Sequence, residues 1–139
     1  MSDLQISLKI QQGIRAYEDE LVQKIEAAFT KKYGQLEPSQ YQNLVQVALS
    51  TESSEVIKNF LRYQVGRDTK WGRGEGSLAE AIIVDIQQAL KQQADAIAKS
   101  AGDAGKAKEV HIELIRRYLG YGKRHLFYLK PPKTESNKK

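Results

Sequence analysis

The sequence predicts an all-α protein that folds as a single compact bundle of about five helices. Apolar residues recur at intervals of three and four along most of the chain, which is the spacing of amphipathic helices. The alternation typical of a β-strand occurs only at 126–129, and no segment repeats another. A chain of 139 residues has the length of one domain. We therefore expect one helical-bundle domain over residues 1–130 and a disordered basic tail over 131–139.

The first predicted helix follows from a stripe of apolar residues at Ile10, Ile14, Tyr17, Leu21, Ile25 and Phe29. We expect this helix to begin between Ser7 and Gly13, because the glycine weakens the first turns. Lys31, Lys32 and Gly34 predict its end, since cations favour the last turn and glycine favours the position after it.

Pro38 predicts the start of a second helix, because proline at the first helical position loses no hydrogen bond. The apolar stripe of this helix consists of Tyr41, Leu44, Val45, Ala48 and Leu49. After a short break at 50–54, a third helix has an inward face formed by Ile57, Phe60, Leu61 and Val65. Its outward face carries Lys58 and Arg62. Residues 67–76 show no periodicity and are predicted to form a loop.

Ser77 and Glu80 form the pattern of a capping box, which is the clearest helix start in the chain. The fourth helix is predicted to end near Ser100, and its stripe consists of Leu78, Ile82, Ile86, Ala89, Leu90 and Ile97. The stripe of a fifth helix consists of Val110, Leu114, Ile115, Tyr118 and Leu119.

Two glycines leave the end of the fifth helix open. The helix either ends at Gly120 and Gly122, with the following residues extended, or continues through both glycines toward Tyr128. Pro131 and Pro132 end any regular structure.

The composition excludes several classes of protein. The chain has no cysteine, so disulfides and thiolate metal sites are excluded. The N-terminus lacks the basic start and continuous apolar core of a signal peptide. No run approaches the ~20 apolar residues of a membrane span. We therefore expect a cytoplasmic protein without a membrane partner.

The net charge of +5 is concentrated in two regions. Residues 106–139 carry ten Lys or Arg against three Glu, and residues 58–76 carry five basic groups against two acidic ones. Basic regions on an otherwise mildly acidic chain indicate a polyanionic partner. The alternative is a solubilising tail together with solvated helix faces.

The sequence predicts neither an enzyme nor a cofactor or metal site. On one continuous helix, His111 and His125 would lie ~21 Å apart at ~1.5 Å per residue, too far to share a metal ion. The glycine-rich run at 72–76 precedes a helix start, where backbone N–H groups can hold a phosphate. It lacks the preceding strand and the GK[ST] ending of a nucleotide-binding loop. We interpret it as an inter-helix loop, or at most as a loop that contacts one phosphate of a nucleic-acid backbone.

Basic residues interleave with aromatic ones in both charged regions, as in nucleic-acid-binding grooves, where cations contact phosphates and rings stack on bases. The candidate nucleic-acid-binding residues are Lys58, Arg62, Arg67, Lys70, Arg73, Arg116, Arg117, Lys123 and Arg124. For Tyr63, Trp71 and Tyr118 we favour a place in the core or at its rim over a stacking role.

Three segments resemble the small helical subunit of type III CRISPR effector complexes, of the III-A kind. Residues 53–61, SSEVIKNFL, resemble the TSxIR helix start of that family, with Lys58 where an arginine is usual. Residues 62–68, RYQVGRD, resemble its YxxGR segment through Tyr63, Gly66 and Arg67. Residues 114–128 resemble its closing helix through Tyr118, Tyr121 and Lys123.

The resemblance implies a non-catalytic subunit of a ribonucleoprotein that acts in antiviral defence. Copies of the chain would stack along the complex beside other effector subunits and line the groove that holds guide and target RNA. Contact with the RNA backbone would fall to Arg62, Arg67 and the basic groups near the C-terminus.

Two other functions remain open at the level of sequence. One is a helical protein-interaction module whose basic surface meets an acidic protein. The other is a helix-turn-helix DNA-binding regulator whose recognition helix starts near Ser53. Only Lys58, Asn59 and Arg62 of that helix would be available to read bases.

Overall fold

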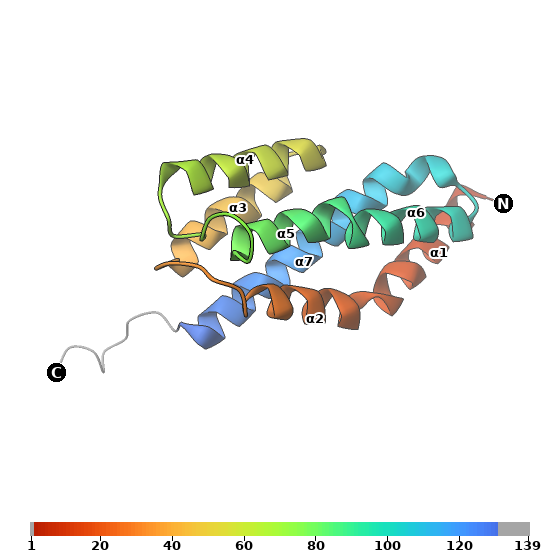
Figure 1. Ribbon diagram of the computed structural model, residues 1–139. Helices are drawn as coiled ribbons and strands as arrows, with labels where there is room; N and C mark the ends of the chain where they lie inside the picture. The colour runs from red at the N-terminus through yellow and green to blue at the C-terminus, as the bar shows by residue number, and fades with distance from the viewer. Residues whose placement is uncertain (1, 131–139) are drawn as a thin grey trace.

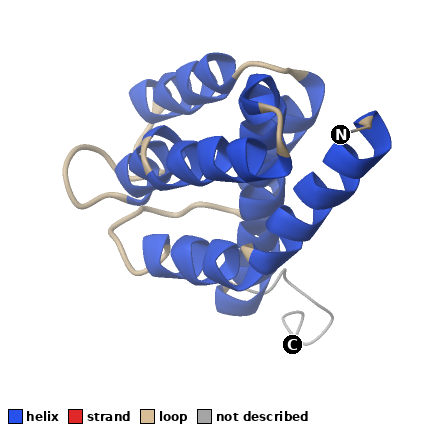
Figure 2. Cartoon of the chain, turned by 90° about the vertical axis from the view of Figure 1, so that its right-hand side faces the viewer, coloured by secondary structure: helices blue, strands red, loops and turns tan. Residues whose placement is uncertain are grey.

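The computed structural model describes residues 2–130 of the chain. These residues form seven α-helices and one short 3-10 helix, with no β-strand among them (Figures 1 and 2). The elements are α1 (Asp3–Ala16), α2 (Glu18–Ala28), α3 (Pro38–Ser50), α4 (Ser54–Arg67), α5 (Leu78–Gln87), α6 (Ala89–Ala101), η1 (Ala104–Lys106) and α7 (Ala107–Leu129). The all-α prediction is confirmed, and the predicted tail at 131–139 lies outside the described residues.

The bundle is arranged around α7, which runs the length of the molecule and packs against α1, α2, α3, α4 and α6. Helices α5 and α6 follow one another in line and cross α7 in the view of Figure 1, and α4 packs on α3 and α5. The α4–α5 loop, the α2–α3 linker and the end of α7 lie together at the left of Figure 1. We call this the loop end of the bundle. The N-terminus lies at the opposite end.

The predicted count of five helices was wrong, because two of the predicted helices are broken. The first is interrupted at Tyr17, whose ψ of −1° lies outside the regular helical value. The fourth is interrupted at Gln88, with φ −113° and ψ −81°. His111 stabilises the second break, since its Nε2 lies 2.8 Å from the carbonyl oxygen of Ile86 in the last turn of α5.

The ends of the first predicted helix also differ from expectation. It begins at Asp3, because Ser2 and Gln5 form a reciprocal capping box ahead of the apolar stripe. Its second half, α2, ends at Ala28. Lys31 and Lys32 therefore lie in the linker to α3 and not in a last helical turn.

Helix α7 settles the alternatives left by its glycines, since it continues through both of them to Leu129. Gly122 is required by packing. A Cβ at this position would lie 2.7 Å from Cγ1 of Ile25 and would overlap the hydroxyl of Tyr41. Gly120 has no such neighbour within 4 Å.

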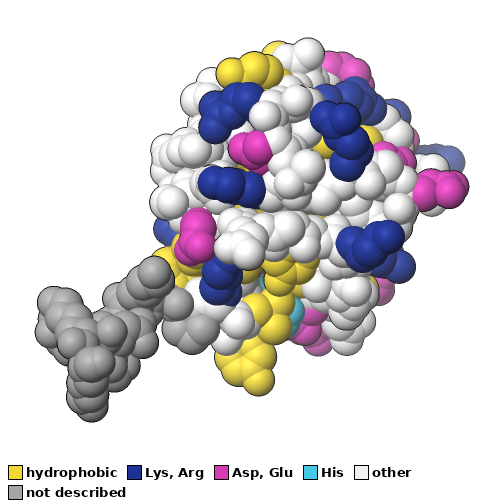
Figure 3. Space-filling view, turned by 60° about the vertical axis from the view of Figure 1, so that its left-hand side comes forward, with side chains coloured by type: hydrophobic (Ala, Val, Ile, Leu, Met, Phe, Trp, Pro, Cys, Tyr) yellow, Lys and Arg dark blue, Asp and Glu magenta, His cyan; other side chains and the backbone are white. Residues whose placement is uncertain are grey.

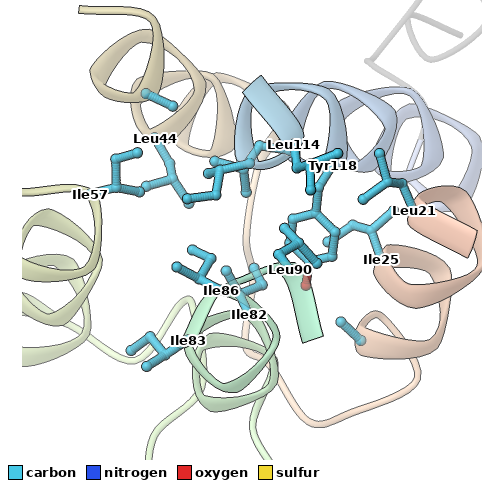
Figure 4. Close-up of a cluster of buried hydrophobic side chains, with 14 of the residues drawn as sticks. Leu21, Ile25, Leu44, Ile57, Ile82, Ile83, Ile86, Leu90, Leu114 and Tyr118 are labelled. Carbon is cyan, nitrogen blue, oxygen red and sulfur yellow. The ribbon is translucent and has the colours of Figure 1, made fainter. Parts of the chain in front are cut away.

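The core contains most of the apolar stripes that the sequence predicts. Leu49 was wrongly assigned to the stripe of the second helix, because it is 56% exposed. Every helix from α2 to α7 contributes to the cluster in Figure 4, which includes Leu21, Ile25, Leu44, Ile57, Ile82, Ile83, Ile86, Leu90, Leu114 and Tyr118. The hydroxyl of the buried Tyr118 donates a hydrogen bond to Oδ2 of Asp85 at 2.7 Å. None of the described helices combines the length and apolar character that crossing a bilayer requires.

Candidate nucleic-acid interface

The loop between α4 and α5 is an ordered structure anchored by a buried tryptophan. Trp71 is 1% exposed, and its ring stacks on Tyr41 with centroids 5.6 Å apart. Oδ1 of Asp68 accepts a hydrogen bond from the Lys70 amide at 2.9 Å, which closes the turn before the tryptophan. Gly72, Gly74 and Gly76 then adopt positive φ angles of 76–78°, which glycine tolerates without strain. Trp71 therefore belongs to the core, as the sequence favoured.

The α2–α3 linker lies beside this loop and is tied to it by backbone hydrogen bonds. The Lys32 amide donates to the Gly76 carbonyl at 2.9 Å, and the Lys32 carbonyl accepts from the Leu78 amide at 2.8 Å. The Gly34 amide donates to the Lys70 carbonyl at 3.0 Å. This pairing brings Lys31 and Lys32 to the loop end, where sequence reasoning did not place them.

The start of α5 has no N–H group left for a phosphate. The Leu78 amide bonds to Lys32, the Ala79 amide bonds to the Trp71 carbonyl at 3.2 Å, and the Glu80 amide bonds to Oγ of Ser77 at 3.1 Å. These are the groups that would hold an anion at a helix N-terminus. The suggestion that the glycine-rich loop uses them to contact a phosphate is therefore wrong.

Six cations surround the loop, and none of them forms an ion pair within residues 2–130. We call Lys31, Lys32, Arg62, Arg67, Lys70 and Arg73 the basic face. All are exposed except Lys70, which is half-buried. Figure 3 views the molecule from the loop end and shows its Lys and Arg side chains as separate patches with fewer acidic side chains between them.

The arginines of the basic face are held by neutral groups. Nη2 of Arg73 donates to the Val65 carbonyl at 3.1 Å, at the end of α4. Nη2 of Arg62 lies 3.4 Å from Oε1 of Gln87. The guanidinium of Arg67 lies 5.9 Å from the ring centroid of Tyr63. Because amides, carbonyls and rings carry no net charge, the positive charge of these arginines remains available to an external anion.

Residues 62–80, which carry four of the six cations, include three acidic residues, Asp68, Glu75 and Glu80. Two of them, Glu75 and Glu80, are exposed, and Asp68 is engaged with the loop backbone. Lys31, Lys32 and residues 62–80 together carry six cations and three carboxylates, a net charge of +3.

Lys58 is predicted to bind nucleic acid, but the structure places it inside. Its side chain is 8% exposed, and its Nζ lies 2.7 Å from Oε2 of Glu55. The same Nζ lies 3.4 Å from Oε1 of Gln87. The hydrogen bond from Lys58 lowers the pKa of Glu55. The charge of this lysine is therefore compensated within the chain.

Arg116 and Arg117 on α7 also make their contacts inside the chain. Nε of Arg116 donates to the Ala48 carbonyl at 2.8 Å and its Nη2 donates to the Thr51 carbonyl at 3.0 Å, at the end of α3. Arg117 pairs with Glu113 at 2.7 Å and with Glu18 at 2.9 Å. The hydrogen bond to Glu113 raises the pKa of Arg117. Both arginines therefore hold α7 to its neighbouring helices.

Lys123 and Arg124 on α7 form no ion pair among the described residues, and Arg124 lines a hollow with Val22 and Glu26 of α2. The nine predicted residues are therefore not brought together into one site. Four of them, Arg62, Arg67, Lys70 and Arg73, lie on the basic face. The structure adds Lys31 and Lys32 to these four. The only signal of their role in the sequence is that two adjacent lysines lie in the linker between two helices.

The aromatic residues of the two charged regions differ in burial, and the core-or-rim prediction holds for only some of them. Tyr118 and Trp71 are buried, in agreement with the favoured interpretation. Tyr121 is half-buried and donates its hydroxyl hydrogen bond to Glu18 at 3.0 Å. For Tyr63 the favoured interpretation was wrong, because this residue is 57% exposed next to the arginines of α4.

The two histidines lie in different environments. His111 is buried at the α5–α6 break, and burial lowers its pKa. Nδ1 of His125 lies 3.8 Å from Oε2 of Glu26. Within residues 2–130 no three His, Cys, Asp or Glu side chains are grouped so that they could hold a metal ion.

The chain matches no protein-family model, and neither the curated proteins nor the solved structures include a significant match to it.

Proposed function

We propose that the chain is a non-catalytic subunit of a ribonucleoprotein and binds the RNA backbone with its basic face. The observation that carries the proposal is the grouping, around the α4–α5 loop, of six cations that form no ion pair among the described residues. Several cations elsewhere, including Lys58, Arg116 and Arg117, are neutralised by carboxylates of the chain. The six on the basic face are not. A group of such cations around one loop favours a polyanion.

The contacts that such a face offers are suited to phosphates. Arginine and lysine side chains neutralise phosphates without reading sequence, whereas specificity requires contacts with base edges. Because Arg62, Arg67 and Arg73 are positioned by neutral groups, they can bind phosphates with little rearrangement. The expected binding is therefore salt-dependent and tolerant of sequence.

The resemblance to the small subunit of type III CRISPR effector complexes supports the same proposal and suggests its setting. In that setting the ligands are guide and target RNA, and the neighbours are other effector subunits and further copies of the chain. Leu4 and Leu8, one turn apart on α1, are 69% and 54% exposed. Exposed leucines at the end opposite the basic face would be covered in an assembly of subunits.

The test is the salt dependence of RNA affinity, measured by fluorescence anisotropy with a labelled single-stranded RNA. If about four phosphates are contacted, log K should fall with log salt at a slope near −3. The double variant Arg62→Ala/Arg67→Ala should move the slope to about −1.5. A matched control is Lys9→Ala/Arg15→Ala, which removes two exposed cations of α1 and should leave the slope unchanged.

A flat salt response, or a response that the Arg62/Arg67 variant does not change, would refute RNA-backbone binding by this face. A protein-interaction module would instead give purified protein free of nucleic acid, with a low ratio of absorbance at 260 to 280 nm, and binding to a folded acidic protein. A helix-turn-helix role is less favoured, because Lys58 is buried and ion-paired and cannot read a base.

A further inference from the structure

Two helical glycines of this protein are explained by packing inside the chain. A Cβ at Gly13 would lie 2.9 Å from Cγ2 of Ile97, and a Cβ at Gly122 would overlap the hydroxyl of Tyr41. Gly66, in the last turns of α4, is not explained in this way. It is exposed, and nothing lies within 4 Å of a Cβ built there. Glycine inside a helix is unfavourable, and one of its uses is to let a ligand approach the backbone closely.

The neighbour that Gly66 leaves uncovered is Tyr63, three residues earlier on the same surface of α4. Residues three and four positions apart are neighbours on a helix. Phe60 and Arg67 therefore lie on one flank of Tyr63. Their contacts agree with this, because the ring centroids of Phe60 and Tyr63 are 6.4 Å apart and the Arg67 guanidinium lies 5.9 Å from the Tyr63 centroid. Asn59 and Gly66 lie on the other flank.

The two flanks of the Tyr63 ring are thus unequal. One is supported by an aromatic ring and a guanidinium group. The other is bordered by the exposed amide of Asn59 and by a glycine with no side chain. Such a ring, supported on one side and uncovered on the other, can accept a planar group by stacking.

We propose that Tyr63 stacks one unpaired base of single-stranded RNA on the flank left open by Gly66. This inference rests on the proposed function, and it identifies the RNA as unpaired where it crosses α4. Asn59 can donate and accept hydrogen bonds at the edge of the base. Arg62 and Arg67, one residue before Tyr63 and four after it, lie where the adjoining phosphates would pass.

Charge favours a nucleic acid over an apolar protein segment as the occupant. The exposed part of α4 beyond Asn59 contains Arg62, Tyr63, Gly66 and Arg67, with no carboxylate among them. Glu55, one turn before Asn59, is held by Lys58. An aromatic ring between unpaired cations is the arrangement with which proteins bind single strands without reading their sequence.

The experiment compares two RNA probes and three variants. The probes are an oligouridine of about 12 nucleotides and an RNA duplex of similar length. Tyr63→Phe keeps the ring, Tyr63→Leu removes it, and Gly66→Gln covers its open flank. Circular dichroism melting verifies that each variant is folded, and fluorescence anisotropy measures its affinity.

We expect Tyr63→Leu to weaken oligouridine binding roughly 5- to 150-fold, the range for loss of one stacked base. Gly66→Gln should also weaken oligouridine binding, and Tyr63→Phe should bind oligouridine as the parent protein does. None of the three should change duplex binding, because paired bases offer no free face.

Equal oligouridine affinity of the parent and Tyr63→Leu would overturn the stacking inference. The proposed function would survive that result if Arg62→Ala/Arg67→Ala still reduced the salt slope. A parallel loss of duplex and oligouridine affinity in Tyr63→Leu would also overturn the stacking inference. The ring would then act by holding the guanidinium of Arg67 in place and not by stacking on a base. Absence of RNA binding by the parent protein would overturn both proposals.

Discussion

The ring of Trp71 stacks on the ring of Tyr41 at an interplanar angle of 27°, although the two residues belong to a loop and to α3. The Tyr41 hydroxyl in turn donates a hydrogen bond to the Leu119 carbonyl of α7 at 2.7 Å. One aromatic pair thus connects the loop that carries part of the basic face to the two helices beneath it. The position of Arg73 and Lys70 depends on this connection.

Trp71→Ala should lower the free energy of unfolding by about 3–5 kcal/mol, because it removes a buried aromatic side chain. Tyr41→Phe should lower it by only about 1 kcal/mol, since the stack remains and one hydrogen bond is lost. Urea denaturation measures both. Tyr128→Ala, at an exposed aromatic residue, is the control and should change stability by less than about 0.5 kcal/mol. A Trp71→Ala protein as stable as this control would disprove the anchoring role.

The glycines of α4 and α7 should respond to alanine in opposite directions. Gly66→Ala and Gly120→Ala should each raise the free energy of unfolding by about 0.5–1 kcal/mol, because their Cβ positions are empty. Gly122→Ala should lower it by about 1–3 kcal/mol, because the added methyl group meets Ile25 and Tyr41. Thermal melting of the three single variants provides the comparison, and a stabilised Gly122→Ala would show that α3 can withdraw from α7.

Arg116→Ala should destabilise the fold by about 1–3 kcal/mol and leave the salt slope of RNA binding unchanged. The guanidinium satisfies carbonyls at the end of α3, where the next residue, Thr51, is extended and provides no glycine cap. Arg124→Ala, which removes an exposed cation from the same helix, is the matched control for stability. If Arg116→Ala reduced the salt slope, Arg116 would belong to the RNA-binding surface after all.

The buried His111 should make stability depend on pH. Burial lowers its pKa from 6.5, with a further lowering by Lys91 and an opposing effect of the hydrogen bond to Ile86. Below pH 6.5 the unfolded chain therefore binds a proton that the folded chain resists. The free energy of unfolding should therefore be highest above this pH. It should decrease as the pH falls toward the folded-state pKa of His111.

The measurement is denaturant unfolding between about pH 5.5 and 7.5, a range in which histidine is the side chain that ordinarily titrates. His111→Gln keeps a donor for the Ile86 carbonyl but cannot be protonated, so its stability should vary less over the same range. Identical pH profiles for the parent and the variant would mean that His111 does not cause the dependence.

The fold class and the inward faces of the helices could be predicted from sequence, because they depend on local periodicity. The capping box at Ser77 is confirmed in its forward half, where Oγ of Ser77 accepts from the Glu80 amide. The breaks at Tyr17 and Gln88 could not be predicted, since neither residue disfavours a helix strongly. The break at Gln88 depends on His111, which is distant in sequence.

The candidate site shows the same limit. Arg62, Arg67, Lys70 and Arg73 were found because they lie close together in sequence. Lys31 and Lys32 join them only through backbone pairing with the loop. The burial of Lys58 and the capping role of Arg116 depend on partners in other helices, which charge counts along the chain do not reveal.

The central place of α7 has a consequence for how the chain acquires its structure during synthesis. Helices α1, α2, α3, α4 and α6 all pack on α7, and α7 starts only at Ala107. During synthesis, the apolar surface of these helices that packs on α7 therefore stays unburied until residues 107–129 leave the ribosome, even where the earlier helices already pack on one another. We expect nascent chains that stall before this point to expose this surface, which is the kind of surface that chaperones protect.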